Sequence, residues 1–192
     1  MRRNHDKEQR PAATLLRSPM SKNLDGWIQT YRNFPKSGIL FYDISPIIEQ
    51  PDRLRIVCEL IRDSIAEWNP NLLAGIDSRG FLFATPVSLM TDIGVVMVRK
   101  KGKLPGEIRE ESYALEYGKA TLAIQKDRDL AGKRVALIDD LLATGGTLAA
   151  AEKLLNNSGA QVVGTVVLIE LKLLNGRRKL KCPVKSLQKY DE

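Results

Sequence analysis

Four short apolar runs set the strongest limit on the fold of this chain. They occupy 72–76, 95–98, 134–138 and 162–169. An apolar run without polar alternation is typical of a strand covered on both faces, as in a parallel sheet. A helix with apolar spacings of three and four is predicted over 51–68, and further helices are predicted over 81–90, despite Pro86, and over 148–156. This alternation predicts an α/β fold with a mostly parallel central sheet flanked by helices.

The rest of the chain gives weaker signals. Residues 99–119 are rich in Lys, Gly and Glu, so we predict a loop there, followed by a short strand over 120–124. Residues 1–20 are polar and aperiodic and are predicted to be a disordered extension. The remaining 21–192 has the length of a single domain. In a sheet of this kind, ligands bind at the carboxyl ends of the strands, so the loops that follow them are the places to search.

Composition narrows the class of protein. The two cysteines, Cys58 and Cys182, make no disulfide framework, and no signal peptide is evident, so a reduced cytoplasmic protein is expected. The single histidine, His5, leaves too few ligands for a zinc site. No apolar run is long enough to span a membrane. The net charge of +7 suits an anionic partner, either a phosphate compound or nucleic acid.

The most informative segment is VALIDDLLATGGT, at 135–147. An apolar strand ends in Asp139 and Asp140, and a loop with Gly145 and Gly146 leads into a helix. Glycines let backbone N–H groups converge on an anion at a helix N-terminus. The loop has no lysine, which excludes the GxxxxGK[ST] nucleotide loop. Carboxylates beside a phosphate need sugar hydroxyls or a hydrated metal as partners, so a ribose 5′-phosphate is predicted.

This segment resembles the phosphoribosyl pyrophosphate motif of type I phosphoribosyltransferases. Other segments, spread over about 24–190, resemble adenine phosphoribosyltransferases in the family's order: FPKSGILFYDISP (34–46), DSRGFLFA (77–84), VRKKGKLPG (98–106), SYALEYGKA (112–120) and IELKLLNGRRKL (169–180). The resemblance implies a type I phosphoribosyltransferase fold with a small hood, built from about 34–46 and 169–181, and a flexible lid loop over 100–119. It implies transfer of the 5-phosphoribosyl group from phosphoribosyl pyrophosphate to adenine, giving AMP and pyrophosphate in purine salvage.

The resemblance also implies residue roles. Ribose phosphate would be bound by Asp139, Asp140, Ala143, Thr144, Gly145, Gly146 and Thr147. Pyrophosphate would be bound by Asp77, Ser78, Arg79, Arg99, Lys100 and Lys103, with a cis peptide after the first of them. Adenine would be bound by Leu40, Phe41, Tyr42 and Leu171. Glu116 would be catalytic, contacting N7 of adenine and moving a proton as N9 attacks. The family commonly has arginine at the position of Tyr42, so only its backbone contact is expected here.

The resemblance further implies a cofactor and a partner. Mg²⁺ would be held by the substrate and by water, with no direct protein ligand. A homodimer is expected, in which cations from 99–103 reach the neighbouring site, and no nucleic-acid or membrane partner is expected. Two alternatives remain open. One is an enzyme for another purine, although a 6-oxo purine needs a donor and 39–43 contains no lysine. The other is a non-catalytic regulator that binds phosphoribosyl pyrophosphate and, through its basic surface, nucleic acid.

Overall fold

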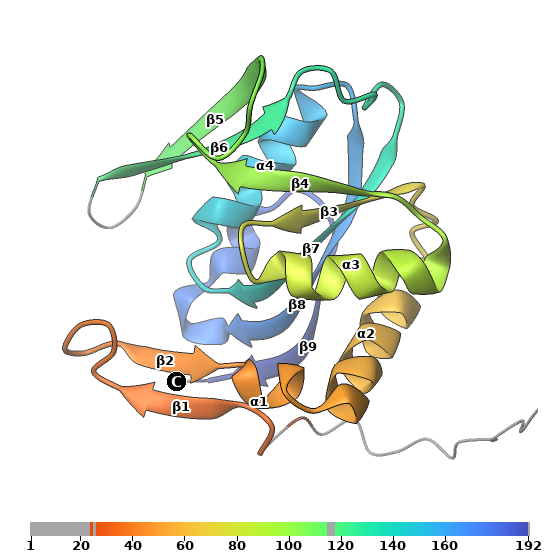
Figure 1. The fold of residues 1–192 in the computed structure, drawn as a ribbon. Helices are drawn as coiled ribbons and strands as arrows, with labels where there is room; N and C mark the ends of the chain where they lie inside the picture. The colour runs from red at the N-terminus through yellow and green to blue at the C-terminus, as the bar shows by residue number, and fades with distance from the viewer. Residues whose placement is uncertain (1–23, 25, 115–117, 192) are drawn as a thin grey trace, which may run out of the picture.

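A seven-stranded sheet forms the centre of the molecule (Figure 1). The computed structural model describes residue 24 and residues 26–114 and 118–191. In order across the sheet, the strands are β5 (Ile108–Ala114), β6 (Lys119–Gln125), β4 (Val95–Lys100), β3 (Leu72–Ile76), β7 (Arg134–Leu142), β8 (Gln161–Leu171) and β9 (Val184–Tyr190). The five from β4 to β9 run parallel, whereas β6 pairs antiparallel with both β4 and β5. The predicted mostly parallel sheet is confirmed.

Helices cover both faces of this sheet. One face packs against α2 (Pro51–Ala66) and α3 (Gly80–Thr91), and the other packs against α4 (Gly146–Asn156). In β7, Ala136 and Ile138 enter the core on the α2 and α3 side, while Val135 and Leu137 enter the core beneath α4. Both sets of side chains are therefore buried, which explains why the strand has no polar alternation.

A small second sheet lies beside the main one. It pairs β1 (Gln29–Arg32) with β2 (Leu40–Asp43) antiparallel, and α1 (Ser45–Ile48) connects it to α2. In Figure 1 this hairpin lies below the carboxyl ends of the central strands, and the β5–β6 ribbon lies above them. Two short 3₁₀ helices follow β8, namely η1 (Lys172–Leu174) and η2 (Gly176–Lys179). Among the residues described, no helix is both long and apolar enough to cross a membrane.

The structure confirms every helix and strand predicted from apolar periodicity, including α3, which contains Pro86. The loop predicted over 99–119 is wrong for part of its length, because β4 continues to Lys100 and residues 108–114 form β5. Among the described strands, β5 lies at the edge of the sheet and pairs with β6 alone, so it tolerates charged residues such as Glu110, which make its sequence resemble a loop. β9 was not predicted, because its sequence VKSLQKY is mostly polar.

Candidate active site

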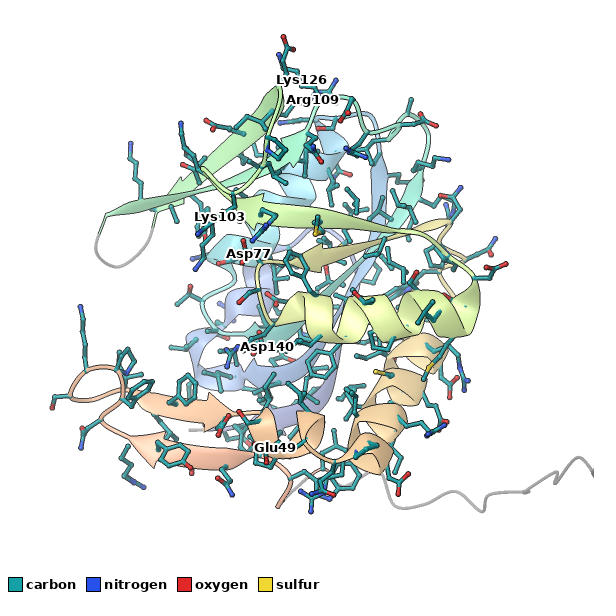
Figure 2. All side chains as sticks on the ribbon, viewed as in Figure 1. Glu49, Asp77, Lys103, Arg109, Lys126 and Asp140 are labelled. Atoms are coloured by element: carbon teal, nitrogen blue, oxygen red, sulfur yellow. The ribbon has the colours of Figure 1, made fainter. Side chains whose placement is uncertain are left out.

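A cavity of about 540 Å³ opens at the carboxyl ends of β3 and β7. The first strand delivers Asp77, Ser78 and Arg79, and the second delivers Asp139 and Asp140. Its other lining residues are Lys100, Tyr113, Ala120, Leu122, Leu141, Ala143, Thr144, Gly145, Gly146, Thr147 and Leu148. Figure 2 shows Asp77 and Asp140 at this edge of the sheet, with Lys103 beyond Asp77. Residues that lie up to 71 positions apart in the sequence thus share one cavity.

The acid pair lies at the end of β7, and both carboxyl groups are nearly buried. Asp139 is 8% exposed and Asp140 is 5% exposed. The backbone N–H of Asp140 donates to Asp139 Oδ1 at 2.9 Å. Burial raises the pKa of the Asp139 carboxyl well above its usual range, and the neighbouring charge of Asp140 raises it further. Burial also raises the pKa of Asp140, although Arg79 opposes this shift.

Arg79 connects three parts of the site. Its Nη2 lies 2.7 Å from Asp140 Oδ2, which forms an ion pair. Its Nη1 donates to the carbonyl oxygen of Tyr42 in β2 at 3.5 Å, and its guanidinium lies 5.6 Å from the ring centroid of Phe41. The loop after β3, the acid pair and the small hairpin are therefore held together by one side chain. One third of the Arg79 side chain is exposed, so it has surface left for an anion.

The loop between β7 and α4 has the geometry of an anion site. Gly145 is the N-cap of α4 and has a φ of 77°, which favours glycine. The first helical hydrogen bond runs from Ala149 N–H to Gly145 O at 3.0 Å, so the N–H groups of the preceding turn stay at the helix end. Gly146 and Thr147 line the cavity at that turn. Together with the helix dipole, these N–H groups favour a bound anion.

Tyr113 reaches this loop from β5. Its hydroxyl oxygen accepts a hydrogen bond from Thr147 Oγ1 at 3.0 Å. A Cβ placed on Gly146 would lie 3.3 Å from the Tyr113 ring, so the ring rests directly on the loop. A second link joins the same elements, because Lys153 of α4 forms a 2.7 Å ion pair with Glu111 of β5. The polar edge strand is thus attached to the helix that begins at the anion site.

Asp77, which follows β3, contacts the end of β4. Arg99 Nε lies 3.1 Å from Asp77 Oδ2, and the Lys100 backbone N–H donates to the same oxygen at 3.4 Å. Arg99 also donates to the carbonyl oxygen of Lys103 at 3.3 Å. The peptide between Asp77 and Ser78 is cis. Asp77 therefore orients Arg99 and the start of the loop that follows β4.

Comparison with known proteins places the chain in a family. The family described as "Phosphoribosyl transferase domain" matches residues 44–190. The adenine phosphoribosyltransferase of Gluconobacter oxydans is 50% identical over 177 residues, which cover 92% of this chain and 99% of that protein. The chain belongs to the adenine phosphoribosyltransferase family. A mammalian member, from Mastomys natalensis, is 47% identical over 168 residues, covering 85% of this chain and 93% of its own length.

Solved structures of adenine phosphoribosyltransferases share the fold. The enzyme of Thermoanaerobacter pseudethanolicus superimposes with a TM-score of 0.83 at 41% identity, covering 85% of this chain and 96% of that chain. The Saccharomyces cerevisiae enzyme, solved in complex with adenine and an imino-altritol bisphosphate, gives a TM-score of 0.79 at 38% identity. It covers 84% of this chain and 94% of that chain. The type I phosphoribosyltransferase fold predicted from the sequence is confirmed.

Relative to the adenine phosphoribosyltransferase pattern, the structure brings together most of the predicted residues. All seven ribose-phosphate residues line the cavity, as do Asp77, Ser78, Arg79 and Lys100. Arg99 and Lys103 lie outside its lining; Arg99 contacts the lining residue Asp77, and the carbonyl oxygen of Lys103 accepts a hydrogen bond from Arg99. Their assignment to pyrophosphate stays a prediction.

None of the four predicted adenine residues lines this cavity, because Leu40, Phe41 and Tyr42 lie in β2 and Leu171 is the last residue of β8. Phe41 packs edge-on against Phe34, with ring centroids 5.1 Å apart, and its ring also lies against the guanidinium of Arg79. Leu40 and Leu171 pack against the core that includes the small hairpin. The Tyr42 side chain is buried and packs against Tyr190, with ring centroids 4.7 Å apart. The Tyr42 side chain is therefore part of the hydrophobic core, at a position where the family commonly has arginine.

Two further predictions concern the catalytic Glu116 and the metal ion. Glu116 lies outside the described residues, so its catalytic role stays a prediction. Within residues 26–114 and 118–191, no three His, Cys, Asp or Glu side chains converge as a metal site would require. Tyr113 lies in the segment SYALEYGKA, which resembles the family, but no role for its side chain was predicted from the sequence. A loop prediction for 99–119 gave no reason to expect its ring above Gly146.

Proposed function

We propose that the cavity binds phosphoribosyl pyrophosphate and adenine and forms AMP and pyrophosphate. The observation that carries this proposal is the placement of the acid pair beside the N-terminal turn of α4 in one cavity. The two ends of a ribose 5-phosphate need these two chemistries. Asp139 and Asp140 accept hydrogen bonds from the ribose hydroxyls, and the turn over 143–147 receives the 5′-phosphate.

The transfer step forms the bond from adenine N9 to C1′ of the ribose. The bond from C1′ to the pyrophosphate oxygen breaks, and the N9 proton leaves the base. Negative charge grows on the departing pyrophosphate, so fixed cations nearby lower the barrier. Arg79 and Lys100 line the cavity, and Arg99 is held beside it by Asp77. We assign these three residues to the leaving group and Glu116 to the proton on the base.

We propose that Mg²⁺ enters with the substrate, held by pyrophosphate oxygens and water. Two of the three aspartates that line the cavity already have cationic partners, because Asp140 is paired with Arg79 and Asp77 with Arg99. This arrangement suits a metal that neutralises the leaving group without direct protein ligands.

We also place the enzyme in the cytoplasm, which fits the two free cysteines, Cys58 and Cys182.

We propose a homodimer formed through the outer face of α3. Leu82 is 43% exposed, Leu89 is 84% exposed and Met90 is 39% exposed, and the neighbouring β4 exposes Met97 at 47%. An apolar face of this kind is typical of an interface between chains. A second copy on this face would also lie close to Arg99, just after Met97.

Leu89→Glu should give the mass of a monomer in light scattering, whereas the same change at exposed Leu173 of η1 should leave a dimer. Monomers in wild type would contradict the proposal.

The test of the activity compares acceptors. With phosphoribosyl pyrophosphate and Mg²⁺, adenine should give the nucleotide, and hypoxanthine and guanine should give far less. Main-chain groups of Leu40 and Tyr42 are proposed to contact the base edge, and no lysine lies in 39–43 to donate to a 6-oxo group. Preference for a 6-oxo purine would support the other-purine alternative. Binding of phosphoribosyl pyrophosphate without turnover of any purine would support the regulator.

A further inference from the structure

The phosphate loop lies in direct contact with η2, a segment that forms no part of the cavity lining. A Cβ placed on Gly145 would lie 2.8 Å from the carbonyl carbon of Gly176. A Cβ placed on Gly176 would lie 2.7 Å from the nitrogen of Gly145 and 2.9 Å from the carbonyl carbon of Thr144, and it would also clash with Ala143 O. Real Cβ atoms essentially never lie under 3.0 Å from such neighbours. The two backbones therefore touch without room for a methyl group on either side.

The two glycines are needed for different reasons. Gly145 has a φ of 77°, so its conformation as well as its surroundings favours glycine. Gly176 is not among the glycines with positive φ, and other residues could adopt its backbone conformation. It is buried, and its missing side chain serves only the close approach to the loop. The loop over 143–145 thus packs directly against the backbone of Gly176.

Arg177, the next residue, fastens this backbone segment to the sheet. Its Nε and Nη2 bind the two carboxylate oxygens of Glu170 in β8 at 2.9 and 2.5 Å. Its Nη1 donates to the carbonyl oxygen of Val184 at the start of β9. Ser186 of β9 donates to Glu170 Oε2 at 2.6 Å. The side chain of Glu170 is 8% exposed, and a two-pronged arginine–carboxylate pair fixes direction as well as distance.

We propose that Gly176 and Arg177 are positioning residues for the phosphate loop. Arg177 locks η2 onto β8 and β9, and Gly176 then presents its backbone as the rear wall of the loop. The wall holds the N–H groups of the turn in the one orientation that fits the 5′-phosphate. This inference rests on the proposed function, because it takes 143–147 as the phosphate site. Neither residue touches the ligand.

The chain offers a matched pair of glycines for the test. Gly94 also lacks a positive φ, and a Cβ there would meet only Leu72 Cδ1, at 3.8 Å. Gly176→Ala should raise the Kd for ribose 5-phosphate, measured by calorimetry, and the KM for phosphoribosyl pyrophosphate. A small displacement of a positioning group costs up to about 100-fold, so we expect an increase of about 10- to 100-fold. The KM for adenine should change less than about twofold, and Gly94→Ala should match wild type throughout.

Arg177→Met tests the anchor, because it keeps an apolar stem and removes the guanidinium fork. It should raise the same Kd, and its effect should combine with that of Gly176→Ala to less than the sum, since both changes act through one wall. If Arg177 only supports the fold, its loss lowers the melting temperature and leaves the Kd for ribose 5-phosphate unchanged. An unchanged Kd in Gly176→Ala would overturn the inference even if Arg177→Met does not fold.

Thr147→Val separates this inference from the proposed function. The change keeps the shape of a direct loop residue and removes its hydroxyl. If wild type binds ribose 5-phosphate and Thr147→Val weakens that binding while Gly176→Ala does not, the phosphate site stands and the positioning role fails. If wild type does not bind ribose 5-phosphate, the phosphate site and the positioning role fail together. Weakened binding in both variants, with normal binding in Gly94→Ala, supports both.

Discussion

Arg79 and Asp140 form an ion pair in which Nη2 lies 2.7 Å from Oδ2, although Arg79 lies in the loop after β3 and Asp140 lies in β7. The pair links the segment assigned to pyrophosphate with the acid pair assigned to ribose. Arg79 extends the link to the small hairpin through Phe41 and the Tyr42 carbonyl. The segments proposed to bind ribose, pyrophosphate and the base therefore share contacts with one guanidinium, and a change at either end of the ion pair should affect more than one of these functions.

Asp139→Asn should lower activity and raise stability. The pKa of Asp139 is raised in the folded protein by burial and by Asp140. A carboxyl group whose pKa is raised by folding stabilises the folded protein at pH values below its pKa in the unfolded chain, about 3.9. This stabilisation is lost as the pH rises through the pKa of the group in the folded protein. Asparagine has no such charge and still offers Oδ1 to the N–H of Asp140. The melting temperature of the variant should therefore match wild type near pH 4 and exceed it increasingly as pH rises. A constant difference would show that Asp139 does not titrate in this way.

Asp140→Asn should weaken catalysis without unfolding the protein. It removes a charged acceptor for a ribose hydroxyl and the partner of Arg79. Loss of one charge-assisted hydrogen bond costs about 1.5–3 kcal/mol, so kcat/KM should fall on the order of 10- to 100-fold. Circular dichroism should confirm the fold. Wild-type kinetics in both Asp139→Asn and Asp140→Asn would remove the ribose assignment.

The sequence was sufficient where one strand and its next turn carry the chemistry. The strand before Asp139 is apolar on both faces, and the glycines after it mark a turn, so both could be predicted locally. Contacts between segments that are distant in the sequence could not be predicted in this way. The meeting of Gly145 with Gly176 depends on how β8 and β9 pack, and nothing in the sequence of η2 shows it. Likewise, the charged residues of β5 are typical of a loop, and only its pairing with β6 makes it a strand.

Tyr113→Phe tests the contact between β5 and the phosphate loop. In the structure Thr147 donates to the Tyr113 hydroxyl, but either hydroxyl can act as donor or as acceptor. With phosphate bound, Thr147 should turn its proton to the ligand while Tyr113 donates to Thr147. Loss of one such hydrogen bond costs about 0.5–1.5 kcal/mol, so the KM for phosphoribosyl pyrophosphate should rise about 2- to 10-fold. Ser112→Ala is the matched control: Ser112 lies in the same strand as Tyr113, its hydroxyl is hydrogen-bonded to Thr121 of β6, and its loss should leave this KM unchanged. An unchanged KM in Tyr113→Phe would remove its role at the loop.

Glu116→Gln tests the assignment of the proton step. Glutamine keeps the size and hydrogen-bonding capacity of glutamate and loses its acid–base function. General acid–base help is worth about 10²–10⁴-fold, so kcat should fall within that range while binding of phosphoribosyl pyrophosphate barely changes. Glu116→Leu should in addition raise the KM for adenine. A kcat within about twofold of wild type for Glu116→Gln would contradict the catalytic role.

The central claim is that the cavity joins adenine to phosphoribose, and formation of AMP tests it most directly. AMP and pyrophosphate should be measured by chromatography after adenine, phosphoribosyl pyrophosphate and Mg²⁺ are mixed with wild type or with an Asp139→Asn, Asp140→Asn double variant. Wild type should form the two products in equal amounts. The folded double variant should form them at least about 100-fold more slowly, since it lacks both acceptors for the ribose hydroxyls. Absence of AMP with wild type, or equal rates for the two proteins, would contradict the account.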